Sequence, residues 1–197
     1  MIGKLVPIRR HQGITDEMSD EALVAACSAS DPAALALLFD RHHHDIHRFL
    51  GRLSGIDADH VDDLLQETFI QLFSSARSFR QGSAVRTWIF GIAANLAKRH
   101  IRSDIRQKAR AGVYLAKLST NESGPAERNE RDQLIGRVEA AIQTLPYDQR
   151  VAFILNDVEE IRGVDAAKAL GVREGTFYRR LHEARKTLRL ALERGGP

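Results

Sequence analysis

The sequence predicts an all-α fold of two small helical domains joined by a flexible linker. Apolar residues recur at helical spacing along most of the chain, and no long stretch alternates apolar and polar residues as a strand would. Turn-forming residues without a core pattern interrupt the helical segments over about 108–130. With 197 residues, 43% of them hydrophobic, the chain is long enough for two small cores and too apolar for general disorder.

The first half has clear helix start signals after a basic N-terminal extension, residues 1–18. Ser19 precedes two acids, which favour the positive end of a helix dipole. Asp31 is a capping carboxylate, and Pro32 suits the first helical position. We therefore expect helices that begin near residues 19 and 31, a third over about 59–74, a polar loop over 75–86 and a fourth helix that contains residues 87–102.

A tryptophan and a row of arginines share one flank of the fourth helix. Ile89, Ile92, Ala93 and Leu96 form its apolar stripe. At about 100° per residue, the residues that fall together beside that stripe are Trp88, Asn95, Arg99, Arg102 and Arg106. An aromatic ring, an amide and guanidinium groups can stack a base, bond its edge and hold phosphates. The same pattern also fits a core tryptophan beside a solvated basic face, and both interpretations stay open here.

The distribution of charge indicates two kinds of partner, although the formal net charge is only +3. Five acids with no Lys or Arg among them lie within residues 57–67. Basic residues dominate 80–110 and 173–194. An acidic surface and two basic ones favour a protein partner and a nucleic-acid partner.

Cysteine content and hydropathy indicate a cytoplasmic protein. The single cysteine, Cys27, excludes an intrachain disulfide and lies among core-type residues. No apolar run is long enough to span a membrane, and the first residues lack the apolar segment of a signal peptide. We therefore expect a reducing cytoplasm and no direct membrane insertion.

The second half begins near residue 131 and ends in a helix-turn-helix pattern. A helix that ends near Leu145 precedes one that Pro146 opens, and a short helix over 164–170, a glycine turn and a longer helix over 174–192 follow. The polar residues expected near the start of the last helix are Arg173, Thr176, Arg179 and Arg180. Recognition helices contact bases with that end. A plain helical hairpin with a charged outer face is the alternative.

The order of these segments resembles the extracytoplasmic-function sigma factors of bacterial RNA polymerase, over roughly residues 19–107 and 131–192. The motifs that carry the resemblance are Asp31-Pro32-Ala33-Ala34 with Leu38-Phe39-Asp40-Arg41-His42, Val61-Asp62-Asp63-Leu64-Leu65-Gln66-Glu67-Thr68-Phe69, Ser78-Phe79-Arg80, Thr87-Trp88-Ile89, Ile92-Ala93-Ala94-Asn95, Leu145-Pro146 with Arg150 and Phe153, and Gly171-Val172-Arg173-Glu174-Gly175-Thr176. Each motif is weak alone, but their order and spacing are specific.

The resemblance implies a non-catalytic initiation subunit with two DNA-binding regions. Residues 19–107 would be sigma region 2 and residues 131–197 sigma region 4, joined by the linker 108–130. The resemblance implies core-polymerase contacts, to the β′ clamp helices, from Asp62, Asp63, Gln66, Glu67, Phe69 and Leu72. It implies −10 contacts from Phe79, Arg80, Trp88, Asn95, Lys98, Arg99 and Arg102. It implies −35 contacts from Arg173, Thr176, Tyr178, Arg179, Arg180 and Lys186.

Further partners follow from the same resemblance: the β flap of polymerase, promoter DNA and an anti-sigma factor. In this family a non-template base is flipped into a protein pocket, and binding energy alone drives the melting. We therefore expect no cofactor and no catalytic residue. The short linker leaves no room for the additional domain of longer relatives.

The sequence departs from the family pattern at three places. Members commonly carry a basic residue and then a serine where this chain has Tyr178 and Arg179. A glycine-leucine-serine style start of the short helix is replaced by Arg162-Gly163-Val164-Asp165. Gly91 stands where a larger residue is common. We therefore expect an unusual −35 preference and do not transfer a −10 consensus.

Two other functions compete with this interpretation. A helix-turn-helix regulator that acts without polymerase would account for residues 131–192 but would leave the acidic helix and the Trp88 segment unexplained. A metal enzyme would have to use the histidines at 42, 43, 44 and 47, of which His43 and His47 have metal-compatible spacing. No acid–histidine signature accompanies them, so we expect exposed helical histidines and no metal.

Overall fold

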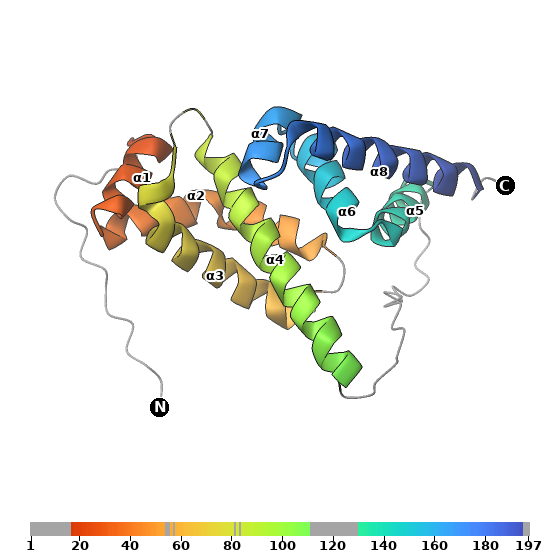
Figure 1. Ribbon diagram of the computed structural model, residues 1–197, viewed down its shortest axis with the longest axis horizontal. Helices are drawn as coiled ribbons and strands as arrows, with labels where there is room; N and C mark the ends of the chain where they lie inside the picture. The colour runs from red at the N-terminus through yellow and green to blue at the C-terminus, as the bar shows by residue number, and fades with distance from the viewer. Residues whose placement is uncertain are drawn as a thin grey trace. The chain divides into compact units, whose positions relative to one another are not determined.

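A computed structural model gives the structure of the chain, and it describes residues 17–53, 56, 58–80, 82, 84–110 and 130–194. Every regular element within these ranges is helical, as the sequence predicts. Figure 1 shows the helices in chain order. The predicted N-terminal extension lies almost entirely outside the described residues, as do residues 111–129 of the predicted linker.

The chain folds into two compact units, with the boundary inside helix α4. The first unit contains α1 (Asp20–Ser28), α2 (Pro32–Gly51), α3 (Ala58–Ser75), the 3₁₀ turn η1 (Ala76–Ser78) and α4 (Val85–Arg110) up to Leu96. The second contains the rest of α4, with α5 (Glu130–Thr144), α6 (Tyr147–Phe153), the π-helical turn η2 (Ile154–Val158), α7 (Gly163–Ala169) and α8 (Glu174–Arg194).

The predicted start signals of the first two helices are confirmed. The Ser19 hydroxyl accepts a hydrogen bond from the Ala22 amide at 3.2 Å, and the Asp31 carboxylate accepts one from the Ala33 amide at 2.9 Å. Pro32 occupies the first turn of α2. Each cap satisfies an amide that the helix itself leaves without a partner.

Aromatic contacts join α2 to the two helices that follow it. Phe39 of α2 meets Phe69 of α3 with ring centroids 4.9 Å apart, and Phe49 of α2 meets Phe90 of α4 edge-on at 5.0 Å. All of these rings except the partly buried Phe39 lie in the buried core. Three-helix packing of this kind fixes which face of α3 and of α4 remains exposed.

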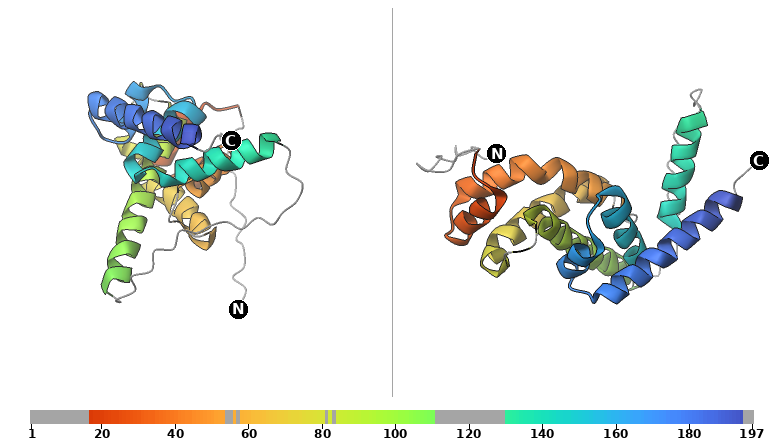
Figure 2. Two further views of the ribbon diagram at one scale, coloured as in Figure 1. Left: turned by 90° about the vertical axis from the view of Figure 1, so that its right-hand side faces the viewer. Right: turned by 90° about the horizontal axis from the view of Figure 1, so that it is seen from above.

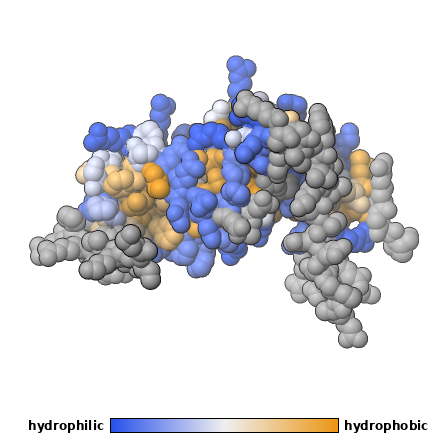
Figure 3. All heavy atoms as spheres, turned by 90° about the horizontal axis from the view of Figure 1, so that it is seen from below, coloured by the Kyte–Doolittle hydropathy of each residue, from blue (hydrophilic) through white to orange (hydrophobic). Residues whose placement is uncertain are grey.

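In the second unit, α5, α6 and α7 each pack against α8, which the right-hand view of Figure 2 shows as a long helix. A cluster of Ala141, Leu145, Ala184 and Leu188 forms part of its core. On the face drawn in Figure 3, hydrophilic residues cover most of the described surface, and hydrophobic residues gather in patches.

Candidate protein and nucleic-acid interfaces

The outer face of α3 carries the four polar residues predicted to bind a protein partner. Asp62, Asp63, Gln66 and Glu67 are all exposed. The buried face of the same helix holds Leu64, Leu65 and Thr68, so the amphipathic pattern directs the acids outward. The His47 ring lies 3.3 Å from the Asp62 carboxylate, which places α2 beside one edge of this face.

Two apolar residues predicted for this interface face the interior instead. Phe69 is 3% exposed and Leu72 is fully buried. Their side chains hold α3 in the core of the first unit, and therefore they are not available to a partner. The prediction was wrong for these two residues because both belong to the helix's core stripe.

Ile70 is the apolar residue that the sequence interpretation missed. It is 66% exposed, the largest value among the exposed large hydrophobic residues of the described chain. Seven residues after Asp63, it projects within about 20° of that residue on a helix of 100° per residue. A helical projection of α3 would have placed Ile70 in the middle of the acidic face. We call Asp62, Asp63, Gln66, Glu67 and Ile70 the α3 face.

The arginine flank of α4 is exposed as predicted. Asn95, Arg99 and Arg102 are exposed, and Lys98 is partly buried. Trp88 is partly buried, and its ring centroid lies 5.1 Å from that of Phe79, a predicted site residue from the segment before the helix. The contact keeps one part of the indole on the protein and leaves another part accessible, an arrangement compatible with both interpretations that the sequence left open.

One basic residue of this segment anchors α4. Arg86, expected in a loop, lies in the first turn of α4 and donates from Nε to the Asp45 carboxylate of α2 at 3.0 Å. Its guanidinium also lies 4.7 Å from the centre of the Phe90 ring. Partial burial opposes ionisation of Asp45, but Arg86 and Arg48 outweigh it and lower the pKa of Asp45. The loop ends two residues earlier than predicted because Val85 and Arg86 find partners in the core.

The turn between α7 and α8 has the geometry that the sequence predicts for a helix-turn-helix. Gly171 adopts φ +67°, and its amide donates to the Lys168 carbonyl at 3.2 Å. The Val172 amide donates to the Ala167 carbonyl at 3.0 Å. Together these bonds form a Schellman motif, which ends α7 and lets α8 start at once.

The first turns of α8 expose most of the predicted DNA-contacting residues. Arg173, Arg179 and Lys186 are exposed, Tyr178 is 44% exposed, and Thr176 is partly buried. Arg180 differs, because it is partly buried and its guanidinium lies 3.0 Å from the Asp148 carboxylate of α6. That ion pair competes with any contact of Arg180 to DNA.

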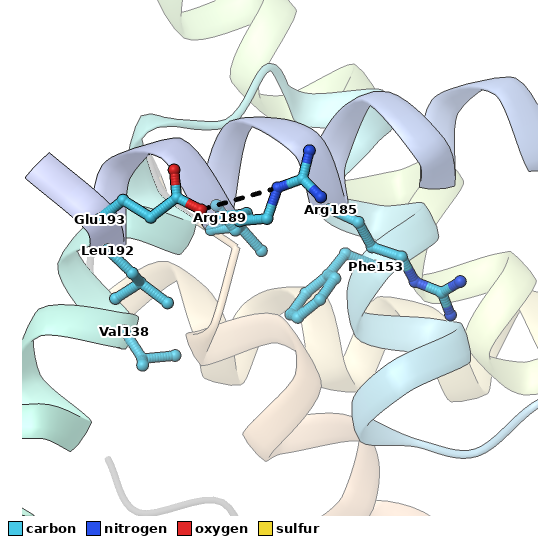
Figure 4. Close-up of a pocket in the computed structure, with 7 residues that line it drawn as sticks. Val138, Phe153, Arg185, Arg189, Leu192 and Glu193 are labelled. Atoms are coloured by element: carbon cyan, nitrogen blue, oxygen red, sulfur yellow. Dashed lines mark ion pairs between the residues drawn. The ribbon is translucent and has the colours of Figure 1, made fainter.

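An apolar groove lies between α5 and α8 on the second unit. Its walls are Val138, Phe153, Leu188 and Leu192, and its rim holds Arg185 with an Arg189–Glu193 ion pair (Figure 4). The side chain of Arg185 is directed away by two bonds to Asp157. The groove is therefore apolar inside and charged at its edge, a combination that suits an amphipathic helix.

Two of the four histidines of α2 differ from the expectation of exposure, whereas His44 and His47 are exposed as expected. His42 is 7% exposed, and its Nε2 lies 2.7 Å from the Asp20 carboxylate. His43 stacks on Phe39 with ring centroids 4.9 Å apart. Within the described ranges, no group of three or more potential ligands is arranged to hold a metal ion. None of the helices in this part of the chain combines the length and apolarity needed to cross a bilayer.

Comparison with known proteins identifies both units. Sigma-70 region 2 matches residues 38–107, and Sigma-70 region 4 matches residues 135–188. The ECF RNA polymerase sigma factor SigM of Mycobacterium tuberculosis is 34% identical over 87% of this chain and 84% of its own length. The ECF RNA polymerase sigma-E factor of Escherichia coli is 27% identical over 89% of this chain and 95% of its own length.

A solved structure agrees with these relatives. The sigma factor RpoE of Bartonella quintana, in complex with the anti-sigma factor NepR, superposes with a TM-score of 0.62 at 27% identity, over 78% of this chain and 93% of that one. The region matches cover the exposed face of α3, the arginine flank of α4 and the helix-turn-helix. The chain therefore belongs to the extracytoplasmic-function sigma factors, the sigma-70 family subunits that direct bacterial RNA polymerase to promoters.

Proposed function

We propose that the α3 face binds the β′ clamp helices of core RNA polymerase. The observation that carries this proposal is the exposure of three carboxylates and one amide around a single exposed isoleucine. Carboxylates guide association with a basic partner surface and select it, whereas Ile70 contributes apolar area that becomes buried. A regulator that acts without polymerase would have no use for such a face.

Charge reversal on this face tests the proposal. Asp63→Lys with Glu67→Lys should weaken core-polymerase binding by about tenfold or more, because a repulsive pair replaces an attractive one. Ile70→Ser should weaken it as well, but with little dependence on salt, since it removes apolar area and no charge. Equilibrium binding to purified core polymerase at several salt concentrations measures both effects.

A matched control makes the result specific. Asp40→Lys with Glu139→Lys changes the net charge by the same amount at exposed positions on α2 and α5. This control should bind core polymerase as the parent does. Equal affinity of the α3-face variants and the parent at physiological salt would rule out the α3 face as the polymerase contact.

The exposed flank of α4, with the segment before it, is the proposed −10 site. Asn95, Arg99 and Arg102 would hold the non-template strand, and Trp88 on Phe79 would offer a stacking surface for a base. Support comes from the exposure of the three polar residues and from the Trp88–Phe79 contact at 5.1 Å. Arg80, also exposed, and Lys98 would add phosphate contacts.

The helix-turn-helix is the proposed −35 site, with α8 in the major groove. Arg173 directly precedes α8 and Arg179 lies in its second turn, at the end that contacts base edges in this motif. Lys186, three turns into the helix, would meet the phosphate backbone. Thr176 and Tyr178 complete the proposed contact surface, whereas the ion pair with Asp148 gives Arg180 a structural role as well.

The groove between α5 and α8 is the proposed site for the β flap. Four apolar side chains line it, and one ion pair lies at its rim. An amphipathic helix would bury apolar area there. Val138→Asp with Leu192→Asp should therefore reduce cross-linking of this domain to the β flap in the holoenzyme, and unchanged cross-linking would rule the site out.

Regulation by an anti-sigma factor completes the proposed function. The solved relative from Bartonella quintana is a complex with such a factor, which supports one for this chain. The protein would act in the cytoplasm, where RNA polymerase is, and would contribute binding energy and no catalytic group. Co-purification of the tagged chain from its source cells should recover either core polymerase or an inhibitor, but not both on one molecule.

A further inference from the structure

Gly163 at the start of α7 and Tyr178 near the start of α8 are in unusually close contact. Gly163 is buried, whereas Tyr178 is 44% exposed. A Cβ atom at position 163 would lie 2.6 Å from Tyr178 Cζ, 2.7 Å from Cε1 and 2.7 Å from the hydroxyl oxygen. Apart from Gly163, its two chain neighbours and the nearby backbone of α7, these are the three nearest heavy atoms to that position. The tyrosine ring thus crosses the backbone of residue 163, and only glycine leaves room for it there.

This contact determines the direction in which the Tyr178 ring points, but the fold of the domain does not depend on it. All three atoms belong to the far end of one side chain, so a methyl group at position 163 can be accommodated by rotation of the ring toward solvent. The core contacts of α8 come from Phe177, Leu181 and Ala184, which are buried on another side of the helix. An alanine at position 163 is therefore expected to displace the Tyr178 phenol and to leave the helices in place.

The position of the phenol suggests what it binds. In a helix-turn-helix, the second helix lies in the major groove while the first helix crosses the phosphate backbone. Tyr178 projects from α8, the second helix, and its hydroxyl lies over Gly163, the first residue of α7. A neutral hydroxyl donor in that place suits a backbone phosphate, which tyrosine commonly contacts.

We infer that Gly163 is a positioning residue that holds the Tyr178 hydroxyl over the start of α7, where it donates to a backbone phosphate of the −35 duplex. The inference rests on the proposed −35 function of the helix-turn-helix. It also joins two of the sequence's departures from the family pattern, since Gly163 belongs to the altered start of the short helix and Tyr178 stands where a basic residue is common. The structure brings these two departures into contact, because the glycine leaves the space that the tyrosine ring occupies.

Closed-complex binding by the full holoenzyme tests this inference. The probe is a duplex promoter that the parent holoenzyme selects from a library randomised in its −35 and −10 regions. Tyr178→Phe should lower affinity roughly tenfold, the effect of losing a hydrogen bond to a charged group. The loss should be equal on every −35 variant, because a phosphate contact carries no sequence information. The salt dependence should not change, since a hydroxyl releases no counterion.

Gly163→Ala should cause a loss similar to that of Tyr178→Phe, and it should act through the ring alone. In a Tyr178→Ala background, adding Gly163→Ala should therefore change affinity by less than about twofold, as expected when a shared contact has already been removed. Gly136→Ala is the matched control, because a Cβ at position 136 meets no heavy atom within 4 Å. It should bind as the parent does.

The possible results separate this inference from the function on which it rests. A parent holoenzyme that ignores the −35 sequence would overturn both. A parent that reads the −35 sequence, with a Tyr178→Phe variant that binds equally well or changes base preference, would overturn the inference alone. If Gly163→Ala unfolds the domain, its behaviour with Tyr178→Ala decides: a folded double variant supports the steric coupling, and an unfolded one contradicts it.

Discussion

At the scale of single residues, Arg150 shows how a charged side chain can hold a small domain together. It is 3% exposed, and its guanidinium donates to the carbonyls of Ile142 at 2.9 Å, Gln143 at 2.6 Å and Leu145 at 2.7 Å. These carbonyls lie at the C-terminal end of α5 and just beyond it, where the helix supplies few amide partners, although the Ile142 carbonyl also accepts a hydrogen bond from the Leu145 amide at 3.2 Å. One side chain therefore ends α5 and ties it to α6.

Removal of Arg150 should destabilise the second unit. Arg150→Ala removes a buried side-chain donor from three carbonyls, although that of Ile142 keeps the Leu145 amide as a second donor, and should lower the free energy of unfolding by about 3 kcal/mol. Arg150→Lys should recover only part of this, because an ammonium cannot reproduce the planar fork. Burial lowers the pKa of Arg150 to about 10, so the group stays charged and the effect should not vary between about pH 6 and 8. Urea unfolding measures it.

The exposed Arg173→Ala is the control for this experiment and should change stability by no more than about 0.5 kcal/mol. An Arg150→Ala variant with the parent's unfolding midpoint would mean that water replaces the guanidinium without loss.

Individual residues also show the limits of what the sequence predicts. Phe69 and Leu72 were predicted to contact polymerase, yet both lie in the core stripe of α3. Only the structure decides between these roles, because burial depends on the helices that pack against α3. Ile70 could have been found, since its projection falls among the acids. The close packing of Gly163 against Tyr178 could not have been found from the sequence, because it depends on the directions of side chains across a turn.

At the scale of elements, α4 combines an anchored start with an exposed flank. Arg86 fixes its first turn to Asp45, and Trp88 packs against Phe79, whereas Asn95, Arg99 and Arg102 extend along the exposed side. A helix anchored in this way holds the backbone from which these polar side chains project. A preorganised binding surface favours the capture of single-stranded DNA, because ordering the strand already costs conformational entropy and the protein then adds little to that cost.

Asn95→Ala and Arg99→Ala should therefore impair promoter opening more than closed-complex binding. The flipped base and the single strand are available only after the duplex has melted. Contacts of these two side chains with them therefore stabilise the open state selectively. The open fraction should fall about tenfold, a loss of about 1.4 kcal/mol. Permanganate reactivity of promoter thymines measures it, alongside run-off yield on duplex and pre-melted bubble templates.

A bubble template should restore part of the lost transcription, because it removes the unstacking cost. Gln107→Ala, exposed on another side of α4, is the control and should open promoters normally. Trp88→Ala is a less clean test, since it would also remove packing against Phe79 and could cost several kcal/mol of stability. Normal reactivity in both the Asn95 and Arg99 variants would make the α4 flank an ordinary solvated surface.

At the scale of the whole molecule, the sequence was most informative where local chemistry decides structure. The Ser19 and Asp31 caps, the Gly171 turn and the helical class of every described element follow from local signals, and the structure confirms them. Boundaries were less predictable, since α4 starts at Val85 and runs to Arg110, into both the predicted loop and the predicted linker. Tertiary contacts such as Arg86 with Asp45 extend a helix beyond its own sequence pattern.

Run-off transcription from linear duplex fragments of the source genome, with purified core polymerase, tests most directly whether this chain directs promoter-specific initiation. Core polymerase alone should give no discrete transcripts. Adding the chain should give discrete transcripts whose start sites map downstream of shared −35 and −10 elements, and the Asp63→Lys, Glu67→Lys variant should abolish them. A chain that binds this DNA but yields no discrete transcript with core polymerase would contradict its role as a sigma factor.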